Sequence, residues 1–363
     1  MRVLQLIDSL NAGGAERMAV HLANGLTSKI SKSYLCATRA EGDLKDTVDD
    51  TVGYLYLKRN GILDVKALWR LYTFVKQEDI SVVHAHASSF FLATLLKWVI
   101  PKIDLIWHDH YGQSEFLSQR PKHAIFWCSY FFKATITVNE ALARWHRVHL
   151  NCKCVTYIPN FVANSNYKRK THLKGEVGKR ILCLANLRPQ KDHFNLLEAF
   201  GLIAQKYPDW TLHCVGRDFN DDYSKQLFET IKVLGLETQV FLYGSCPDTE
   251  WIISQSDIGV LASKSEGLPL SLLEYGLGGL AVIATDVGDN KRVIQSRASG
   301  CLVASAHVET LAEALMFFMN NEKQRKSCGK HLQNHIKSEF DADAILDRIF
   351  KVYLSINKSY AIH

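Results

Sequence analysis

The feature that most constrains the fold is an alternation of short, β-rich apolar runs with longer segments of helical period, and this alternation occurs twice. In the first half the predicted strands are residues 3–7, 34–37, 82–85, 105–107, 135–138 and 155–158. Helical stretches such as residues 15–26 lie between most of them. Strands that alternate with helices favour a parallel sheet covered by helices on both faces.

The pattern breaks over residues 164–180, which are polar and strongly basic, and we predict a linker there, or a loop just after one. A second alternation follows, with strands at residues 181–184, 212–215, 240–242, 258–262 and 282–285. We therefore predict an α/β protein of two Rossmann-like, doubly wound domains, residues 1–165 and 166–340. Their facing strand ends would form a central cleft for the ligand. Residues 341–363 would add a helix over residues 342–356, with an apolar face of Ile345, Ile349, Val352 and Leu354. The sequence leaves open where this helix docks.

Composition and charge exclude several classes of protein. The net charge of +6 is mildly basic and falls short of a nucleic-acid-binding signature. The nine cysteines form no CxxC pair, so they indicate neither a zinc site nor a redox motif and suit a reducing, cytoplasmic compartment. No secretory signal is evident, and the longest apolar run, residues 90–100, contains Lys97 and is too short to cross a bilayer. We expect a protein that is soluble or rests on a membrane face.

Two segments could bind an anionic ligand. Gly13 and Gly14 lie between the first strand and its helix, where backbone N–H groups suit a phosphate, although a tight turn without a ligand fits equally well. The segment SKSEGLPLSLLEYG places Glu266 in a loop and Glu274 about one turn inside the following helix. Each carboxylate alone could be an ordinary solvated charge. Their apolar surroundings favour two acceptors for sugar or ribose hydroxyls.

This segment resembles a known family. EGLPLSLLE, with Glu266 and Glu274 eight residues apart, is similar to the E-x7-E motif of retaining GT-B glycosyltransferases of glycosyltransferase family four, or group 1, including enzymes of bacterial capsule and O-antigen synthesis. The resemblance covers nearly the whole chain. Matching segments are residues 13–17 (GGAER), 84–88 (HAHAS), 157–160 (YIPN), 184–193 (LANLRPQKDH) and 285–290 (TDVGDN).

The resemblance implies a retaining, metal-independent hexosyltransferase that needs no cofactor. It would move a hexose or N-acetylhexosamine from a UDP- or GDP-sugar, held by the second domain, to a saccharide or polyprenyl-linked saccharide held by the first. Glu274 would hold the ribose and Glu266 the transferred sugar, with Gly267 and Leu268 in the same donor-binding loop. Lys191 would face the diphosphate, where fixed positive charge stabilises the departing group.

The chain departs from the family pattern near that lysine. The usual arginine, five residues before it, is Asn186. Arg188 could reach the same phosphate from a shifted position, or it could be a surface arginine.

The family also places a histidine at the end of a first-domain strand. His108 and His110 are both candidates, and His108 is slightly favoured because it ends the predicted strand and precedes an acid. A neutral imidazole there could hydrogen-bond a sugar hydroxyl or carry a proton. A metal pair is the alternative reading of HxH, but no third ligand stands at a regular spacing.

The positive charge is concentrated in the first half, with 19 Lys and Arg against 14 Asp and Glu over residues 1–165. Basic residues there alternate with aromatics: Lys122, Lys133, Arg144, Arg147 and Lys153 with Phe126, Trp127, Tyr130, Phe131, Phe132 and Trp145. The pattern fits either ordinary amphipathic helices or a face that contacts an anionic membrane, on the cytoplasmic side of the inner membrane.

Two other functions fit the same architecture. One is a nucleotide-sugar epimerase, and the other is a non-catalytic sugar-nucleotide-binding subunit. NAD-dependent chemistry is disfavoured, because neither domain begins with GxGxxG followed by an acid about 20 residues on.

Overall fold

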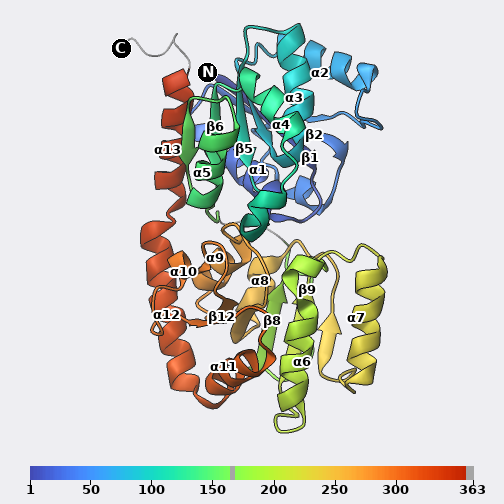
Figure 1. The fold of residues 1–363 in the computed structure, drawn as a ribbon, viewed down its shortest axis with the longest axis vertical. Helices are drawn as coiled ribbons and strands as arrows, with labels where there is room; N and C mark the ends of the chain where they lie inside the picture. The colour runs from blue at the N-terminus through green and yellow to red at the C-terminus, as the bar shows by residue number, and fades with distance from the viewer. Residues whose placement is uncertain (164–167, 357–363) are drawn as a thin grey trace. The chain divides into compact units, whose positions relative to one another are not determined.

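The computed structural model describes residues 1–163 and 168–356, and these form two compact units (Figure 1). Unit 1 comprises residues 1–163 together with residues 342–356, and unit 2 comprises residues 168–341. Each is a parallel sheet with helices packed on it, so the predicted pair of Rossmann-like α/β domains is confirmed.

Unit 1 contains a seven-stranded sheet in the order β3-β2-β1-β4-β5-β6-β7, with every pairing parallel. Its strands are β1 Arg2–Ser9, β2 Lys32–Ala40, β3 Gly53–Tyr56, β4 Val82–His86, β5 Asp104–Asp109, β6 Ala134–Thr137 and β7 Val155–Tyr157. Its helices are α1 Gly14–Gly25, α2 Val65–Gln77, α3 Phe90–Val99, α4 His123–Cys128, α5 Glu140–His149 and α13 Ala342–Ile356.

Unit 2 contains a six-stranded parallel sheet in the order β10-β9-β8-β11-β12-β13. Its strands are β8 Arg180–Leu184, β9 Thr211–Val215, β10 Val240–Leu242, β11 Ile258–Leu261, β12 Ala281–Thr285 and β13 Cys301–Val303. Its helices are α6 His193–Ala204, α7 Asp222–Val233, α8 Thr249–Ser254, α9 Leu270–Leu277, α10 Asn290–Val293, α11 Val308–Asn320 and α12 Glu322–Glu339.

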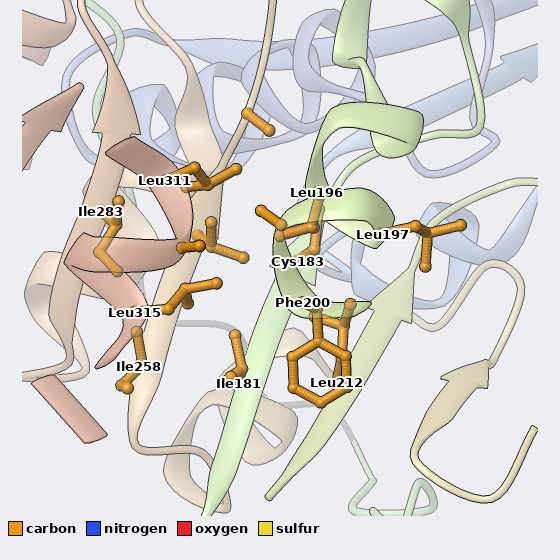
Figure 2. Packing of buried hydrophobic residues seen from close by; sticks show 14 of the residues in the cluster. Ile181, Cys183, Leu196, Leu197, Phe200, Leu212, Ile258, Ile283, Leu311 and Leu315 are labelled. Carbon is orange, nitrogen blue, oxygen red and sulfur yellow. The ribbon is translucent and has the colours of Figure 1, made fainter. Parts of the chain in front are cut away.

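The central strands of unit 2, β8 and β11, are buried along their whole length because helices cover both faces of a parallel sheet. In unit 2, Figure 2 shows Leu196 and Phe200 of α6 and Leu311 of α11 packed over side chains of β8, β9, β11 and β12. Burying a Leu, Ile or Phe side chain contributes about 1.5–3 kcal/mol. Cores of this kind fix the strands whose ends carry the site.

Helix α13 has the bounds predicted from its apolar periodicity, and the structure supplies its docking site, which is unit 1. Ile345, Ile349 and Val352 are buried as predicted. Leu354 is only half-buried, and Tyr353, which the helical period did not single out, is fully buried in its place.

Polar contacts also hold α13 on unit 1. Asp347 pairs with Lys29 at 2.6 Å, and the Arg348 guanidinium donates to the Tyr157 carbonyl at 2.8 Å. The final helix of the chain is therefore part of the first domain.

The sequence analysis missed two short strands, β3 and β13. Both lie at sheet edges and are largely half-buried, so they carry little apolar signal.

The segment predicted as a linker, or a loop just after one, is a loop of unit 2 over residues 168–179, and Arg180 begins β8. The backbone N–H groups of Lys170 and Thr171 each donate to Asp248 at 2.8 Å within this unit. Residues 164–167 lie outside the described residues.

Within residues 1–163 and 168–356, no helix has both the length and the apolar character needed to cross a membrane.

Candidate active site

Each sheet reverses its strand order beside its first strand, between β1 and β4 in unit 1 and between β8 and β11 in unit 2. Ligands of open α/β sheets bind outside the carboxyl ends of the strands at such a switch point. In unit 2 the loop after β8 carries Lys191, and the loop after β11 carries Glu266. The topology thus brings together two residues that are 75 positions apart in the sequence.

Lys191 and Glu266 form a shielded ion pair. The Lys191 Nζ donates to Glu266 Oε1 at 2.6 Å, and the Ser263 hydroxyl donates to the same oxygen at 2.6 Å. The Glu266 side chain is 4% exposed and that of Lys191 is 18% exposed. An ammonium group has three N–H donors, so a partly exposed Lys191 can bind a second anion while it holds Glu266.

The Glu266 loop is fixed by its neighbours. The backbone N–H of Asp289 donates to the carbonyl oxygen of Gly267, the residue after Glu266, at 2.9 Å. At Gly288, which has a φ of +54°, a Cβ atom would clash with the Glu266 carbonyl, so this approach requires glycine. Thr285 Oγ1 donates to Ser263 O at 2.7 Å.

The two loops are also tied to each other. Lys264 N donates to Gln190 O at 2.8 Å, and the Lys264 ammonium pairs with Asp192 at 3.0 Å. The charged pair is therefore preorganised, which is the arrangement that stabilises developing charge best.

Glu274 lies on α9, about one turn beyond its start, and is half-buried. Thr249 Oγ1 donates to Glu274 Oε1 at 3.3 Å. Gly267 and Leu268 are buried in the loop that leads to this helix. Four of the predicted donor residues therefore lie on one loop and the helix that follows it, with Lys191 joined to them through Glu266: Glu266, Gly267, Leu268 and Glu274.

The Arg188 carbonyl accepts a hydrogen bond from Lys191 N at 2.9 Å, but its side chain contacts an aromatic ring. Its guanidinium lies over the Phe219 ring at 4.6 Å, and the side chain is exposed. Asn186, at the position of the family arginine, accepts a hydrogen bond from Arg217 N at 2.8 Å. Asn186 thus has a structural contact, and a phosphate role for Arg188 stays a prediction.

In unit 1 the glycine turn precedes α1, with Gly13 as the N-cap residue and Gly14 as the first helical residue. A Cβ atom at Gly13 would clash with the Glu16 carboxylate, which therefore lies against the turn. A carboxylate is favoured at this positive end of the helix and repels a second anion. Nothing in the sequence around Glu16 singles this residue out, and phosphate binding by Gly13 and Gly14 stays a prediction.

Four imidazoles gather near the ends of β4 and β5. His84 and His86 lie on β4, His108 lies on β5, and His110 follows β5. His108 is 1% exposed, and neither of its ring nitrogens has a hydrogen-bond partner among the described residues. His110 is half-buried, and its Nε2 forms a hydrogen bond with Nδ1 of His86 at 3.0 Å. Of the two predicted histidines, the structure favours His110 for contact with a ligand.

Burial keeps these imidazoles neutral. It lowers the pKa of His110 to about 4 and that of His84 to about 3, and it holds the pKa of His86 and of His108 well below 6.5. Positive charge on neighbouring imidazoles contributes in the same direction for His84, His86 and His108. A neutral imidazole has one N–H donor and one acceptor nitrogen, which suits a sugar hydroxyl.

The alternative of a metal site gains candidate ligands from this cluster, because nitrogens of His84, His86 and His108 lie within 4.8 Å of one another. The geometry argues against it. The rings of His84 and His108 stack with an interplanar angle of 9°. His84 and His86 also have protein partners already, since His84 Nδ1 contacts the Tyr353 hydroxyl at 2.7 Å and His86 contacts Gln5 at 2.8 Å. Metal independence stays a prediction.

A buried charge network stands beside His110. The Arg120 guanidinium donates to both oxygens of Asp109, at 2.6 and 2.9 Å, and His146 Nε2 donates to Asp109 at 2.8 Å. Although burial opposes it, the charge of Arg120 with the His146 contact lowers the pKa of Asp109. Asp109 is therefore ionised but neutralised, and it is not an available base. The sequence offered no signal for Arg120, which is 11 residues away.

This fold and these sites define a two-domain glycosyltransferase. The family described as "Glycosyl transferases group 1" matches residues 164–335, and the one described as "Glycosyltransferase Family 4" matches residues 12–165. The two matches together extend over residues 12–335. The chain therefore belongs to the glycosyltransferases of group 1 and family 4, as its sequence motifs predicted.

Particular relatives act in bacterial polysaccharide synthesis. The chain is 24% identical over 343 residues, 88% of each chain, to the Escherichia coli UDP-Gal:alpha-D-GlcNAc-diphosphoundecaprenol alpha-1,3-galactosyltransferase. It is 23% identical over 176 residues, 48% of this chain and 50% of the other, to a lipopolysaccharide core mannosyltransferase of Rhizobium leguminosarum. Among solved structures, HepE of Anabaena in complex with UDP and glucose has a TM-score of 0.81 at 17% identity, covering 97% of this chain and 98% of that one.

Proposed function

We propose that this chain is a retaining, metal-independent hexosyltransferase of cell-surface polysaccharide synthesis. Its donor would be a UDP- or GDP-sugar carrying a hexose or N-acetylhexosamine, and its acceptor a saccharide or a polyprenyl-linked saccharide. The observation that carries the proposal is the shielded Lys191–Glu266 pair at the switch point of unit 2. The E. coli relative is named for a UDP-sugar donor and a diphosphoundecaprenol acceptor, which supports the same classes here.

The proposed mechanism uses fixed charge in place of a metal ion. The Lys191 ammonium would neutralise the diphosphate as the bond to the sugar breaks, when negative charge on it grows. Glu266 would accept hydroxyls of the transferred sugar, and Glu274 both ribose hydroxyls. The acceptor hydroxyl would attack on the face that the diphosphate leaves, and the diphosphate would take its proton. No enzyme nucleophile is required.

We further propose that unit 1 rests on an anionic membrane surface that holds the acceptor. Part of the predicted aromatic set is exposed: Trp127 is 66% and Tyr130 is 57% exposed, and their rings stack at 6.1 Å. Trp98, 61% exposed, packs on Phe131 beside them. Exposed Lys102, Lys122 and Lys133 follow in the same segments. Aromatic rings with flanking lysines suit a headgroup layer. Phe132 and Trp145 are buried and belong to the core instead.

A donor screen tests the proposed reaction. The protein would be incubated with UDP-, GDP- and ADP-sugars in EDTA, with and without membrane lipid extract, and the released nucleoside diphosphate measured. We expect release from one UDP- or GDP-sugar, strengthened by the extract. Glu274→Ala should lower this activity at least tenfold, about the effect of losing one charged hydrogen bond. Glu250→Ala, an exposed carboxylate on α8, is the matched control.

The other outcomes of the screen separate the alternatives. Isomerised sugar without an acceptor product would indicate an epimerase. Tight donor binding without release would indicate a non-catalytic binding subunit. Loss of activity in EDTA, restored by a divalent ion, would overturn metal independence.

Flotation with vesicles tests the membrane surface. We expect binding to phosphatidylglycerol vesicles at low salt, and weaker binding of Trp127→Ala. Absence of binding to anionic vesicles would remove this part of the proposal and leave the transferase reaction untouched.

A further inference from the structure

A chain of hydrogen bonds runs from the last helix of the protein to His110. We infer that Tyr353 of α13, acting through Gln5 and His86, fixes the ring orientation and the tautomer of His110. Tyr353 is thus a positioning residue. The inference rests on the proposed function, in which His110 is the imidazole that contacts a sugar hydroxyl.

The contacts are continuous. Gln5 Nε2 donates to the Tyr353 hydroxyl at 3.3 Å, Gln5 Oε1 meets His86 Nε2 at 2.8 Å, and His86 Nδ1 meets His110 Nε2 at 3.0 Å. The Tyr353 hydroxyl also contacts His84 Nδ1 at 2.7 Å. Four structural elements contribute: α13, β1, β4 and the residue after β5.

Each contact determines the next. Because the Gln5 carbonyl oxygen only accepts, His86 Nε2 must carry the proton. His86 Nδ1 is then the acceptor, so His110 must donate from Nε2. The remaining nitrogen of His110, Nδ1, carries a lone pair and is left for a ligand. His110 therefore accepts a hydrogen bond, and its partner is a hydroxyl group rather than a phosphate oxygen.

Water has no access to the inner part of this chain. Tyr353, Gln5, His84 and His86 are each 0% exposed, whereas His110 is half-buried. Burial also raises the pKa of Tyr353, so its hydroxyl stays protonated. In a dry site each hydrogen bond has few competitors, and losing one member leaves its neighbours unsatisfied.

The test is the tautomer of His110, read from histidine side-chain nitrogen shifts in the full-length protein, with His110→Asn to assign the signals. We expect protonated Nε2 and unprotonated Nδ1 in the parent. In Tyr353→Phe, which keeps the ring and removes the hydroxyl, the two shifts should move toward each other as the tautomers mix. Gln5→Met breaks the chain at a second point and should have the same effect.

Asp347→Asn is the matched control, because it removes a contact of α13 with unit 1 that lies outside the chain. It should leave the His110 shifts unchanged. A protonated Nδ1 in the parent, or unchanged shifts in both Tyr353→Phe and Gln5→Met, would overturn the inference. This measurement needs no donor or acceptor, so it stands apart from failure of the proposed reaction.

Kinetics supply the second readout. Once the donor is known, Tyr353→Phe should lower kcat about 3- to 10-fold, the effect of one hydrogen bond, with the donor KM unchanged. Equal losses in Asp347→Asn would show that α13 acts only by docking.

Discussion

The two units share the same order in their first six strands but present opposite chemistry at their switch points. Unit 2 places an ammonium group against a carboxylate, Lys191 and Glu266, in loops tied to each other. Unit 1 places neutral imidazoles there, and the carboxylate beside them, Asp109, is neutralised by Arg120. Because the strand order is the same, the difference in chemistry comes from the residues in the loops and at the strand ends.

This difference follows the electrostatics of the proposed substrates. A nucleoside diphosphate is strongly charged, and fixed charge binds it best where water is partly excluded. A sugar hydroxyl is neutral, and a neutral imidazole meets it without the cost of burying a charge. Each unit therefore matches one of the two substrates in the proposed reaction.

The largest expected effect is at Lys191. Lys191→Ala should lower kcat/KM for the donor about 100-fold or more, because it removes the cation that faces the diphosphate. It also leaves Glu266 as a buried carboxylate without its cation, which costs about 3–5 kcal/mol of stability. Nucleoside diphosphate release and urea unfolding would measure the two effects.

Lys264→Ala is the control for that variant. Lys264 lies in the same loop as Glu266 but is exposed and pairs with Asp192. Its loss removes one tie between the two loops but leaves the Lys191 charge in place, so kcat/KM should fall by no more than about tenfold, the effect of one hydrogen-bonded contact. Equal effects of the two variants would show that the loop, and not the Lys191 charge, matters.

Mild acid should lower the free energy of unfolding of unit 1 more than that of unit 2. Among the described residues, one histidine of unit 2 has a lowered pKa, His213. Five histidines of unit 1 have a lowered pKa: His21, His84, His86, His108 and His110. As pH falls below about 6.5 the unfolded chain takes up protons that the folded unit refuses. The free energy of unfolding of unit 1 should then fall by up to about 1.4 kcal/mol per pH unit for each such histidine.

Hydroxyl-radical footprinting along a urea series, at about pH 7.5 and about pH 5, would report the two units separately. We expect the midpoint of unit 1 to drop further than that of unit 2. Equal drops, or a larger drop for unit 2, would contradict neutral burial of the histidine cluster.

The smallest expected effect is at Arg188. Because its guanidinium is exposed and lies on Phe219, Arg188→Ala should raise the donor KM only about threefold. Donor titrations would measure it, with Arg217→Ala as the control, since Arg217 lies over the same ring at 5.0 Å. A loss near that of Lys191→Ala would restore Arg188 as a direct phosphate ligand.

Local pattern was enough to predict much of the fold. The bounds of α13 follow from its apolar period, and the central strands from their apolar runs. The edge strands β3 and β13 were missed because half-buried strands carry little such signal. The loop around Glu266 was identified because both glutamates lie within one short segment of sequence.

Contacts between distant segments were not predictable in this way. Glu16 beside Gly13, Arg120 on Asp109 and Tyr353 beside Gln5 are each ordinary residues in their own segments. Similarly, sequence alone slightly favoured His108 over His110 as the ligand-contacting histidine. In the structure His108 is buried and His110 is half-buried, which favours His110.

The sequence by itself determined the class of the protein, two parallel α/β domains of a glycosyltransferase family, because hydrophobic period and short motifs are local properties of the chain. Only the tertiary structure decided which side chains share a site. Lys191 meets Glu266, and α13 supplies Tyr353 to the first domain, because sheet order brings the ends of separate strands together. Burial and hydrogen bonding, which set charge and tautomer, exist only once those segments are packed.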